Sequence, residues 1–244
     1  MSHGMVGKRF YRDYVHSEDL KAYTVVEQES DLQIYAKEDI GEAAKKWLEK
    51  YRRDLQHYIG KNRDFLHSLT PTTVEPWAPE IVRHMAGASL KAEVGPMAAV
   101  AGAISEYVGK KLLEITNEVM IENGGDIFIK TDKVRRILIY AGSSPFSNQI
   151  VLKISPQDTP MGVCTSAGTV GHSLSFGKAD AVVVLSKDTP LADAAATAIG
   201  NLIQTAEDIE DGINYGKAIE GIEGIMIIVG DKLGAWGNIS IEKP

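Results

Sequence analysis

The sequence predicts an α+β fold, a mainly antiparallel sheet flanked by helices. Short runs of β-favouring residues recur along the chain, and longer segments carry apolar residues at helical spacing. The strands are too irregularly spaced for a repeated βαβ pattern, which argues against a parallel sheet. The 244 residues, 44% hydrophobic and 24% charged, have an ordinary globular composition. We therefore expect a single domain over residues 1–244.

The first part of the chain predicts a meander followed by a helix. β-favouring residues indicate three short strands at Lys8–Val15, Ala22–Glu27 and Leu32–Tyr35. Apolar residues then recur at helical spacing from Ile40 to Leu66, which predicts one long amphipathic helix.

The next segments predict two helices and a hairpin. One helix is expected over Ala78–Ala88. The second, over Met97–Asn117, is rich in Ala and Gly, which let another backbone or a ligand approach closely. Val119–Ile129 has the pattern of strand, tight turn and strand.

The last part of the chain predicts further strands around a well-marked helix. The helix runs from Pro190 to about Glu207, because Thr189 can accept from free N–H groups and Pro190 fits the first helical position. A shorter helix is expected over Ile213–Ile219. The remaining strands are expected over Arg136–Ala141, Gln149–Ile154, Met161–Thr165, Ala179–Ser186, Ile225–Val229 and Gly237–Ile241.

Composition argues against several classes of partner. The net charge of −7 argues against nucleic acid, and the basic stretch Lys45–Arg63 alternates with acids, as on a solvated helix face. The single cysteine, Cys164, rules out an intrachain disulfide. No stretch reaches the ~18 apolar residues of a membrane span. We expect a cytoplasmic protein with neither a nucleic-acid nor a membrane partner.

Two glycine-containing motifs could contact a nucleotide. Asn123-Gly124-Gly125-Asp126 lies between two strands, and bare N–H groups in such a turn can hold phosphate oxygens. An ordinary hairpin turn explains the same residues. The second motif, Thr165-Ser166-Ala167-Gly168, offers hydroxyls and small residues at a strand end, although a plain polar loop has the same composition.

Four further side chains could carry chemistry. Asp193 and Thr197 share one helix face and could offer oxygen ligands to a hard cation, or serve the helix alone. His172 could orient or protonate a leaving group. Cys164 could be a nucleophile if its pKa is lowered, or a buried small hydrophobe.

In this order the motifs resemble the ApbE-like family, whose best-known members are magnesium-dependent flavin transferases. Those enzymes cleave FAD and attach FMN to a threonine or serine of a target protein. The stretch Val94–Gly102 together with Glu122–Asp126 is closer still to a compact, uncharacterised prokaryotic branch. The family's pattern falls here on Ala98–Ala103, Asn123–Asp126, Cys164–Gly168 and Ala192–Thr197.

The resemblance implies roles for these positions. Asp193 and Thr197 would supply side-chain oxygens to Mg²⁺, with a backbone carbonyl near Val100 or Ala101 as a further ligand. The motifs at 123–126 and 165–168 would line FAD or a related nucleotide, and His172 would match the family's histidine. The segment Ser173–Lys178 lacks the acid that follows this histidine in the transferases.

Three functions stay open from the sequence. The first is an ApbE-like protein that binds a flavin or nucleotide with Mg²⁺ and transfers FMN or a phosphoryl group, with a protein as acceptor. The second is a thiol- or persulfide-based sulfur protein that uses Cys164. The third is a non-catalytic binding or assembly module. A homo-oligomer is expected because it is the commonest choice.

Overall fold

A large antiparallel sheet organises the molecule. The structure, a computed structural model, describes residues 19–168 and 176–244. Within these ranges eight strands pair in the order β1-β2-β3-β4-β7-β8-β9-β10, and a second sheet has the order β11-β6-β5. The expected α+β class is confirmed. The strands are β1 (Lys21–Glu27), β2 (Ser30–Ala36), β3 (Val119–Asn123), β4 (Asp126–Lys130), β5 (Arg135–Leu138), β6 (Val151–Ile154), β7 (Met161–Ser166), β8 (Ala181–Ser186), β9 (Ile222–Val229), β10 (Lys232–Gly237) and β11 (Ile241–Glu242).

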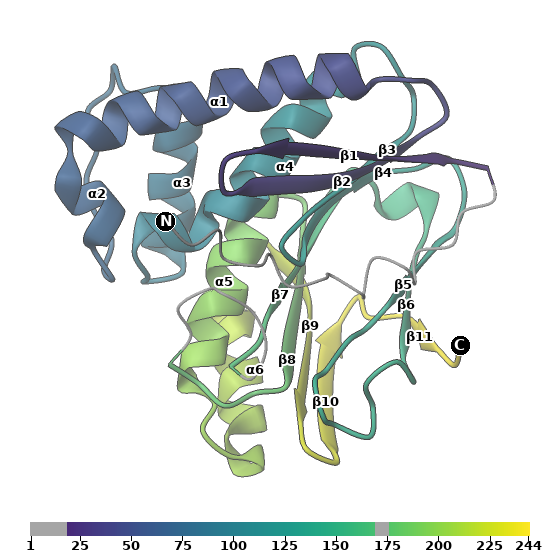
Figure 1. Cartoon of the computed structure of the whole chain (residues 1–244). Coiled ribbons are helices and arrows are strands. Elements are labelled where there is room, and N and C mark those ends of the chain that lie inside the picture. Colours follow the sequence, from purple (N-terminus) through teal and green to yellow (C-terminus); the bar gives the residue numbers. More distant parts are fainter. Residues whose placement is uncertain (1–18, 169–175) are drawn as a thin grey trace, which may run out of the picture.

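Helices cover one face of the large sheet and the small sheet lies over the other (Figure 1). α4 packs on β3 and β4, α5 on β7 and β8, and α6 on β9. The helices are α1 (Gly41–Lys61), α2 (Arg63–His67), α3 (Glu80–Lys91), α4 (Val100–Leu112), α5 (Thr189–Leu202) and α6 (Ile209–Ala218), with short 3₁₀ turns at Pro96–Ala99, Pro156–Asp158 and Ala206–Asp208.

Strand alternation creates two separate cores. Phe128 on β4 packs into the helix-side core, whereas its neighbours Ile127 and Ile129 pack toward the small sheet. β7 does the same, because Cys164 faces the helices and Val163 faces the small sheet. Successive side chains of a strand point to opposite faces, so a central strand covered on both faces is apolar throughout.

All five expected helices form, but with different bounds. α3 extends to Lys91, α5 ends at Leu202 rather than near Glu207, and α6 begins at Ile209. The two other helices differ more. The helix expected over Ile40–Leu66 is interrupted at Asn62, which has φ −128° and ψ 75° and separates α1 from α2. The helix expected over Met97–Asn117 is shorter. A 3₁₀ turn precedes it, so α4 begins at Val100 and ends at Leu112.

The C-terminal half holds the largest differences. β5 and β6 do not continue the main sheet but form the small one. β10 (Lys232–Gly237) was not expected from the sequence, and it pairs with β9 along the edge of the large sheet. Only Ile241 of the strand expected over Gly237–Ile241 lies in β11. The strand expected at Lys8–Val15 lies outside the described residues.

Candidate functional site

The Asn-Gly-Gly-Asp motif forms the hairpin turn between β3 and β4, as expected. Asn123 and Asp126 are the last paired residues, and Gly124 and Gly125 have φ of +69° and +106°. These left-handed conformations suit glycine and give the turn the twist that a two-residue hairpin needs.

The residues flanking this turn are buried, unlike those of most hairpin tips. Asn123 and Asp126 are each 8% exposed. The Asn123 Nδ2 donates to the Ala101 carbonyl at 3.2 Å, and the Ser105 Oγ lies 3.0 Å from the Asp126 carbonyl. The hairpin end is thereby held against the first turns of α4.

The Ala101 carbonyl is one of the two that the resemblance implies as a metal ligand. It also lies 2.7 Å from the Ser105 Oγ, in addition to its bond from Asn123. The single hydroxyl proton of Ser105 is shared between this carbonyl and that of Asp126, so the Ala101 carbonyl already has partners within the chain.

Asp193 lies at the N-terminus of α4, although it belongs to α5. Its Oδ2 accepts from the Gly102 N–H at 2.8 Å, and the Ala101 N–H also stabilises its charged form. Burial opposes ionisation and raises the pKa of Asp193 to about 7. The Asp193 carboxylate of α5 therefore caps the N-terminus of α4, a helix 91 residues earlier in the sequence.

Asp126 is the second buried acid of the site. Burial, followed by repulsion from Asp193, raises the pKa of Asp126 well above its usual value. The Cys164 thiol and the Thr165 N–H donate to it and partly oppose that rise. Two carboxyl groups that repel each other in a buried site favour retention of a proton or the binding of a cation.

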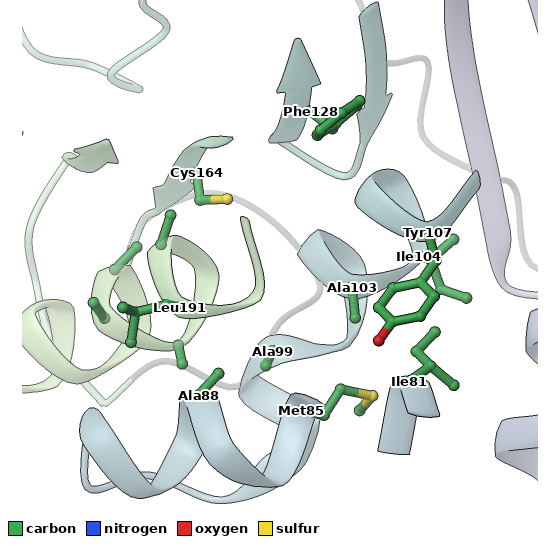
Figure 2. Packing of buried hydrophobic residues seen from close by; sticks show 14 of the residues in the cluster. Ile81, Met85, Ala88, Ala99, Ala103, Ile104, Tyr107, Phe128, Cys164 and Leu191 are labelled. Atoms are coloured by element: carbon green, nitrogen blue, oxygen red, sulfur yellow. The ribbon is translucent and has the colours of Figure 1, made fainter. Parts of the chain in front are cut away.

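Cys164 of β7 lies beside both acids and next to the first turn of α5. Figure 2 shows it in the same packed layer as Ala103 of α4 and Leu191 of α5. The thiol is completely buried, and its Sγ lies 3.5 Å from the Thr189 carbonyl. Burial, then the charges of Asp126 and Asp193, raise the pKa of Cys164 well above its usual value. This environment disfavours the thiolate that sulfur chemistry requires.

The start of α5 differs in one detail from the expectation. Asp188, not Thr189, is the capping residue, and its Oδ1 accepts from the Leu191 N–H at 3.0 Å. Thr189 is the first helical residue, and its N–H donates to the Glu106 Oε2 of α4 at 2.7 Å. Aspartate and threonine are both common at the cap position, so the sequence alone could not show which of these two adjacent residues is the cap.

Glycines allow the site elements to approach closely around Thr189. A Cβ on Gly102 of α4 would lie 2.7 Å from the Thr189 carbonyl and 2.9 Å from the Asp193 Cβ. A Cβ on Gly162 of β7 would lie 2.6 Å from the Thr189 Cα. The small residues expected to let a backbone approach α4 therefore serve packing within the chain.

Several backbone N–H groups that could hold phosphate are already bonded within the chain. The Gly125 N–H donates to the Glu122 Oε1 at 2.8 Å, and the Gly168 N–H donates to the Ala179 carbonyl at 2.9 Å. The Thr165 N–H interacts with the Asp126 carboxylate. These groups hold the motifs in place, so the phosphate cradle expected from them is not open at these positions.

The two sequence motifs nevertheless come together. A Cβ on Gly125 would lie 3.6 Å from the Thr165 carbonyl. Ser166 and Ala167 are half-buried, as is Thr197, whereas Gly168 is exposed. His172 lies outside the described residues.

The oxygen donors of this candidate site suit a hard cation. Among the described residues, no three His, Cys, Asp or Glu side chains converge as a metal group. The oxygens present are the Asp126 and Asp193 carboxylates, and the Thr197 hydroxyl lies on the same helix face as Asp193. Mg²⁺ commonly takes one or two carboxylates and completes its shell with water and substrate phosphates. The residues present therefore fit that ion.

Sequence reasoning missed two acids that the structure brings into the site. Glu106 is 1% exposed, and Glu122 is 7% exposed. Glu106 stands four residues before Lys110, a spacing typical of an exposed helix pair, so the pattern masked its burial. Glu122 directly precedes the Asn-Gly-Gly turn, and its place after three apolar residues of β3 is the one available signal.

Comparison with known proteins agrees with this architecture. The family model described as "AbpE bacteria" matches residues 12–233. A UPF0280 protein of Methanococcus aeolicus is 46% identical over 201 residues, which cover 80% of this chain and 81% of that protein. The UPF0280 protein of Methanocaldococcus jannaschii is 45% identical over 195 residues, covering 78% and 79%.

Solved structures share the fold at low identity. The flavin transferase ApbE from Vibrio cholerae superposes with a TM-score of 0.62 at 13% identity, covering 89% of this chain and 96% of that one. The apo flavinyl transferase ApbE from Pseudomonas stutzeri gives a TM-score of 0.61 at 15% identity, covering 89% and 94%. From the family match and the close UPF0280 relatives, we conclude that this chain belongs to the ApbE-like family.

Proposed function

We propose that this protein binds a flavin dinucleotide together with Mg²⁺, and that the site supports transfer of the FMN moiety. The observation that carries the proposal is the buried Asp126–Asp193 pair beside the N-terminus of α4. The shared fold with proteins named flavin transferases supports the choice of ligand.

The chain's own groups have distinct tasks in this proposal. Asp193 would hold the cation through the carboxylate oxygen that Gly102 does not occupy, together with the Thr197 hydroxyl. The residues Asn123–Asp126 and Thr165–Gly168 would line the nucleotide, and His172 would assist the leaving group. When bound, Mg²⁺ would neutralise charge on the pyrophosphate.

The transfer step has a defined balance. An acceptor hydroxyl of a protein would form a bond to the FMN phosphorus, the pyrophosphate P–O bond would break, and AMP would leave. The hydroxyl proton would pass to a base or to water. Water in place of the acceptor would give hydrolysis with the same release of AMP.

Equilibrium binding of FAD with and without Mg²⁺, followed by flavin fluorescence, tests the site. We expect Mg²⁺-dependent binding that weakens at least about tenfold in Thr197→Val and in Asp193→Asn, which keeps an acceptor for Gly102. Asp231→Asn is the control, because Asp231 is exposed and lies in the β9–β10 turn. Unchanged affinity in both site variants, or no binding by the wild type, would overturn the proposal.

Chromatography of the same mixtures separates the functions. AMP release indicates transfer or hydrolysis, whereas binding without release indicates the non-catalytic module. The buried, protonated Cys164 gives the sulfur alternative no comparable support. The expected homo-oligomer stays a prediction that light scattering can check.

A further inference from the structure

Glu106 is a buried carboxylate to which neither the sequence motifs nor the proposed chemistry gives a task. Its side chain is 1% exposed, and its Oε1 accepts from Lys110 at 2.6 Å on the same helix. Its Oε2 accepts from the N–H of Thr189, 83 residues later, at 2.7 Å. A buried carboxylate with two donors and a specific long-range partner fixes geometry as well as charge.

The Thr189 N–H depends on this acceptor. Thr189 is completely buried, and its own hydroxyl has no partner. The local cap, Asp188, is already used by the Leu191 N–H. The first N–H of α5 is therefore bonded only because Glu106 of α4 lies beside it.

A second hydrogen bond joins α4 and α5, one helical turn away from the first on each helix. Gly102 of α4 bonds to Asp193 of α5, and Glu106 of α4 bonds to Thr189 of α5. The two bonds are four residues apart on each helix and run in opposite directions, so together they fix how far α5 can slide along α4. The backbone at Gly102 lies so close to Thr189 and Asp193 that a side chain at this position would push the two helices apart.

We infer that Glu106 is a positioning residue, which sets the place of Asp193 and Thr197 by holding the first turn of α5. The inference rests on the proposed function for its consequence, because those two residues are the ones assigned to Mg²⁺. Without the Glu106 acceptor, α5 would shift to satisfy the Thr189 N–H, and the Asp193 carboxylate would move off the Gly102 N–H.

Three substitutions separate positioning from charge. Glu106→Gln keeps an acceptor oxygen at the same reach. Glu106→Asp keeps the charge but is one methylene too short, and Glu106→Met removes both. Lys110→Met is the matched control, because it removes the other partner of Glu106 and leaves the Thr189 bond.

The first measurement is amide hydrogen exchange by NMR, without ligand and well below the melting temperature of each variant. In Glu106→Asp and Glu106→Met we expect the Gly102 amide to exchange faster than its neighbours on α4. In Glu106→Gln and Lys110→Met we expect it to exchange at the wild-type rate. If Glu106→Met does not fold, the result for Glu106→Asp decides. A purely structural role would speed amide exchange uniformly across α4. Unchanged exchange at Gly102 in Glu106→Asp would equally overturn the inference.

The second measurement is the Mg²⁺ concentration that gives half-maximal FAD binding. We expect it to rise about tenfold in Glu106→Asp and to stay near wild type in Glu106→Gln, as for other residues that orient metal ligands. An unchanged Mg²⁺ requirement in Glu106→Asp would contradict positioning of the metal ligands. Failure of the wild type to bind FAD would instead overturn the proposed function, and Gly102 exchange would then decide the positioning alone.

Discussion

Asp193 and Glu106 cap each other's helices. Asp193 on α5 accepts from the Gly102 N–H of α4, and Glu106 on α4 accepts from the Thr189 N–H of α5. Each carboxylate lies where the partner helix concentrates positive charge, so the interaction is favourable in both directions. The contact joins two segments that lie far apart in the sequence.

The close approach at Gly102 gives the first prediction. Gly102→Ala places a Cβ 2.7 Å from the Thr189 carbonyl oxygen, which belongs to the backbone and cannot rotate away. We expect a loss of about 1–3 kcal/mol in the free energy of unfolding, measured by urea denaturation. Gly87→Ala on α3 is the control, since nothing lies within 4 Å of that Cβ. It should be neutral or stabilising by up to about 1 kcal/mol, and equal losses in both would contradict the packing argument.

The Asp126–Asp193 pair predicts how stability depends on pH. The folded pKa of both groups lies above the ordinary value of 3.8, and that of Asp193 is raised to about 7. Their ionisation penalty is absent below pH 3.8 and grows as the pH rises through about 7, so stability falls over that window in metal-free protein.

Asp126→Asn should remove most of this fall. We expect its melting temperature to exceed that of the wild type at pH 8 by at least about 2 °C, and the gain to shrink at pH 5, because one buried charge is gone. Asp231→Asn, on the surface, should leave the pH profile unchanged. Equal shifts at pH 5 and pH 8 would show that repulsion between the two acids is not the cause.

A buried ion pair joins β5 to the residue just before β3 and gives the third prediction. Arg135 on β5 pairs with Glu118 at 2.6 Å, and Glu118 is 1% exposed. Arg135→Ala leaves a buried carboxylate with less compensation and should cost about 3–5 kcal/mol in stability. The adjacent Arg136 forms an exposed pair with Glu242, so Arg136→Ala should cost under about 1 kcal/mol. Thermal or urea unfolding of the two variants makes the comparison.

The burial of Cys164 predicts its reactivity. We expect thiol reagents to label it at the rate at which the protein opens, far slower than in the chain unfolded by urea. Labelling followed by mass spectrometry measures this. Fast modification of the folded protein at neutral pH would restore the sulfur alternative. Cys164→Ser should show no modification, which confirms the residue.

Local signals explain which parts of the fold the sequence predicted. The turn at Gly124–Gly125 was predicted because its backbone conformation demands glycine. The start of α5 was predicted within one residue from Pro190 and its neighbours. The placement of β5 and β6 was not, because apolar alternation marks a strand without saying which sheet it joins.

The candidate site could be predicted from the sequence only where its residues belong to a recognisable local motif. The hairpin and Asp193 stand in recognisable patterns, and the structure brings both to the N-terminus of α4. Glu106 escaped because its four-residue spacing from Lys110 imitates a surface pair. Burial of Glu106 depends on α5, whose first residue follows 83 residues later in the chain, and no local pattern contains that information.

The reciprocal capping also bears on how the protein folds. During synthesis α4 is complete long before α5 is made. The N-terminal amides of α4 therefore stay hydrated until Asp193 is available. Contacts at such long sequence separation form slowly and late. A fragment ending after β7 would therefore keep most of the strands and α4 but have an open helix end at Gly102. The contact between α4 and α5 is therefore completed only after the chain has been synthesised through α5.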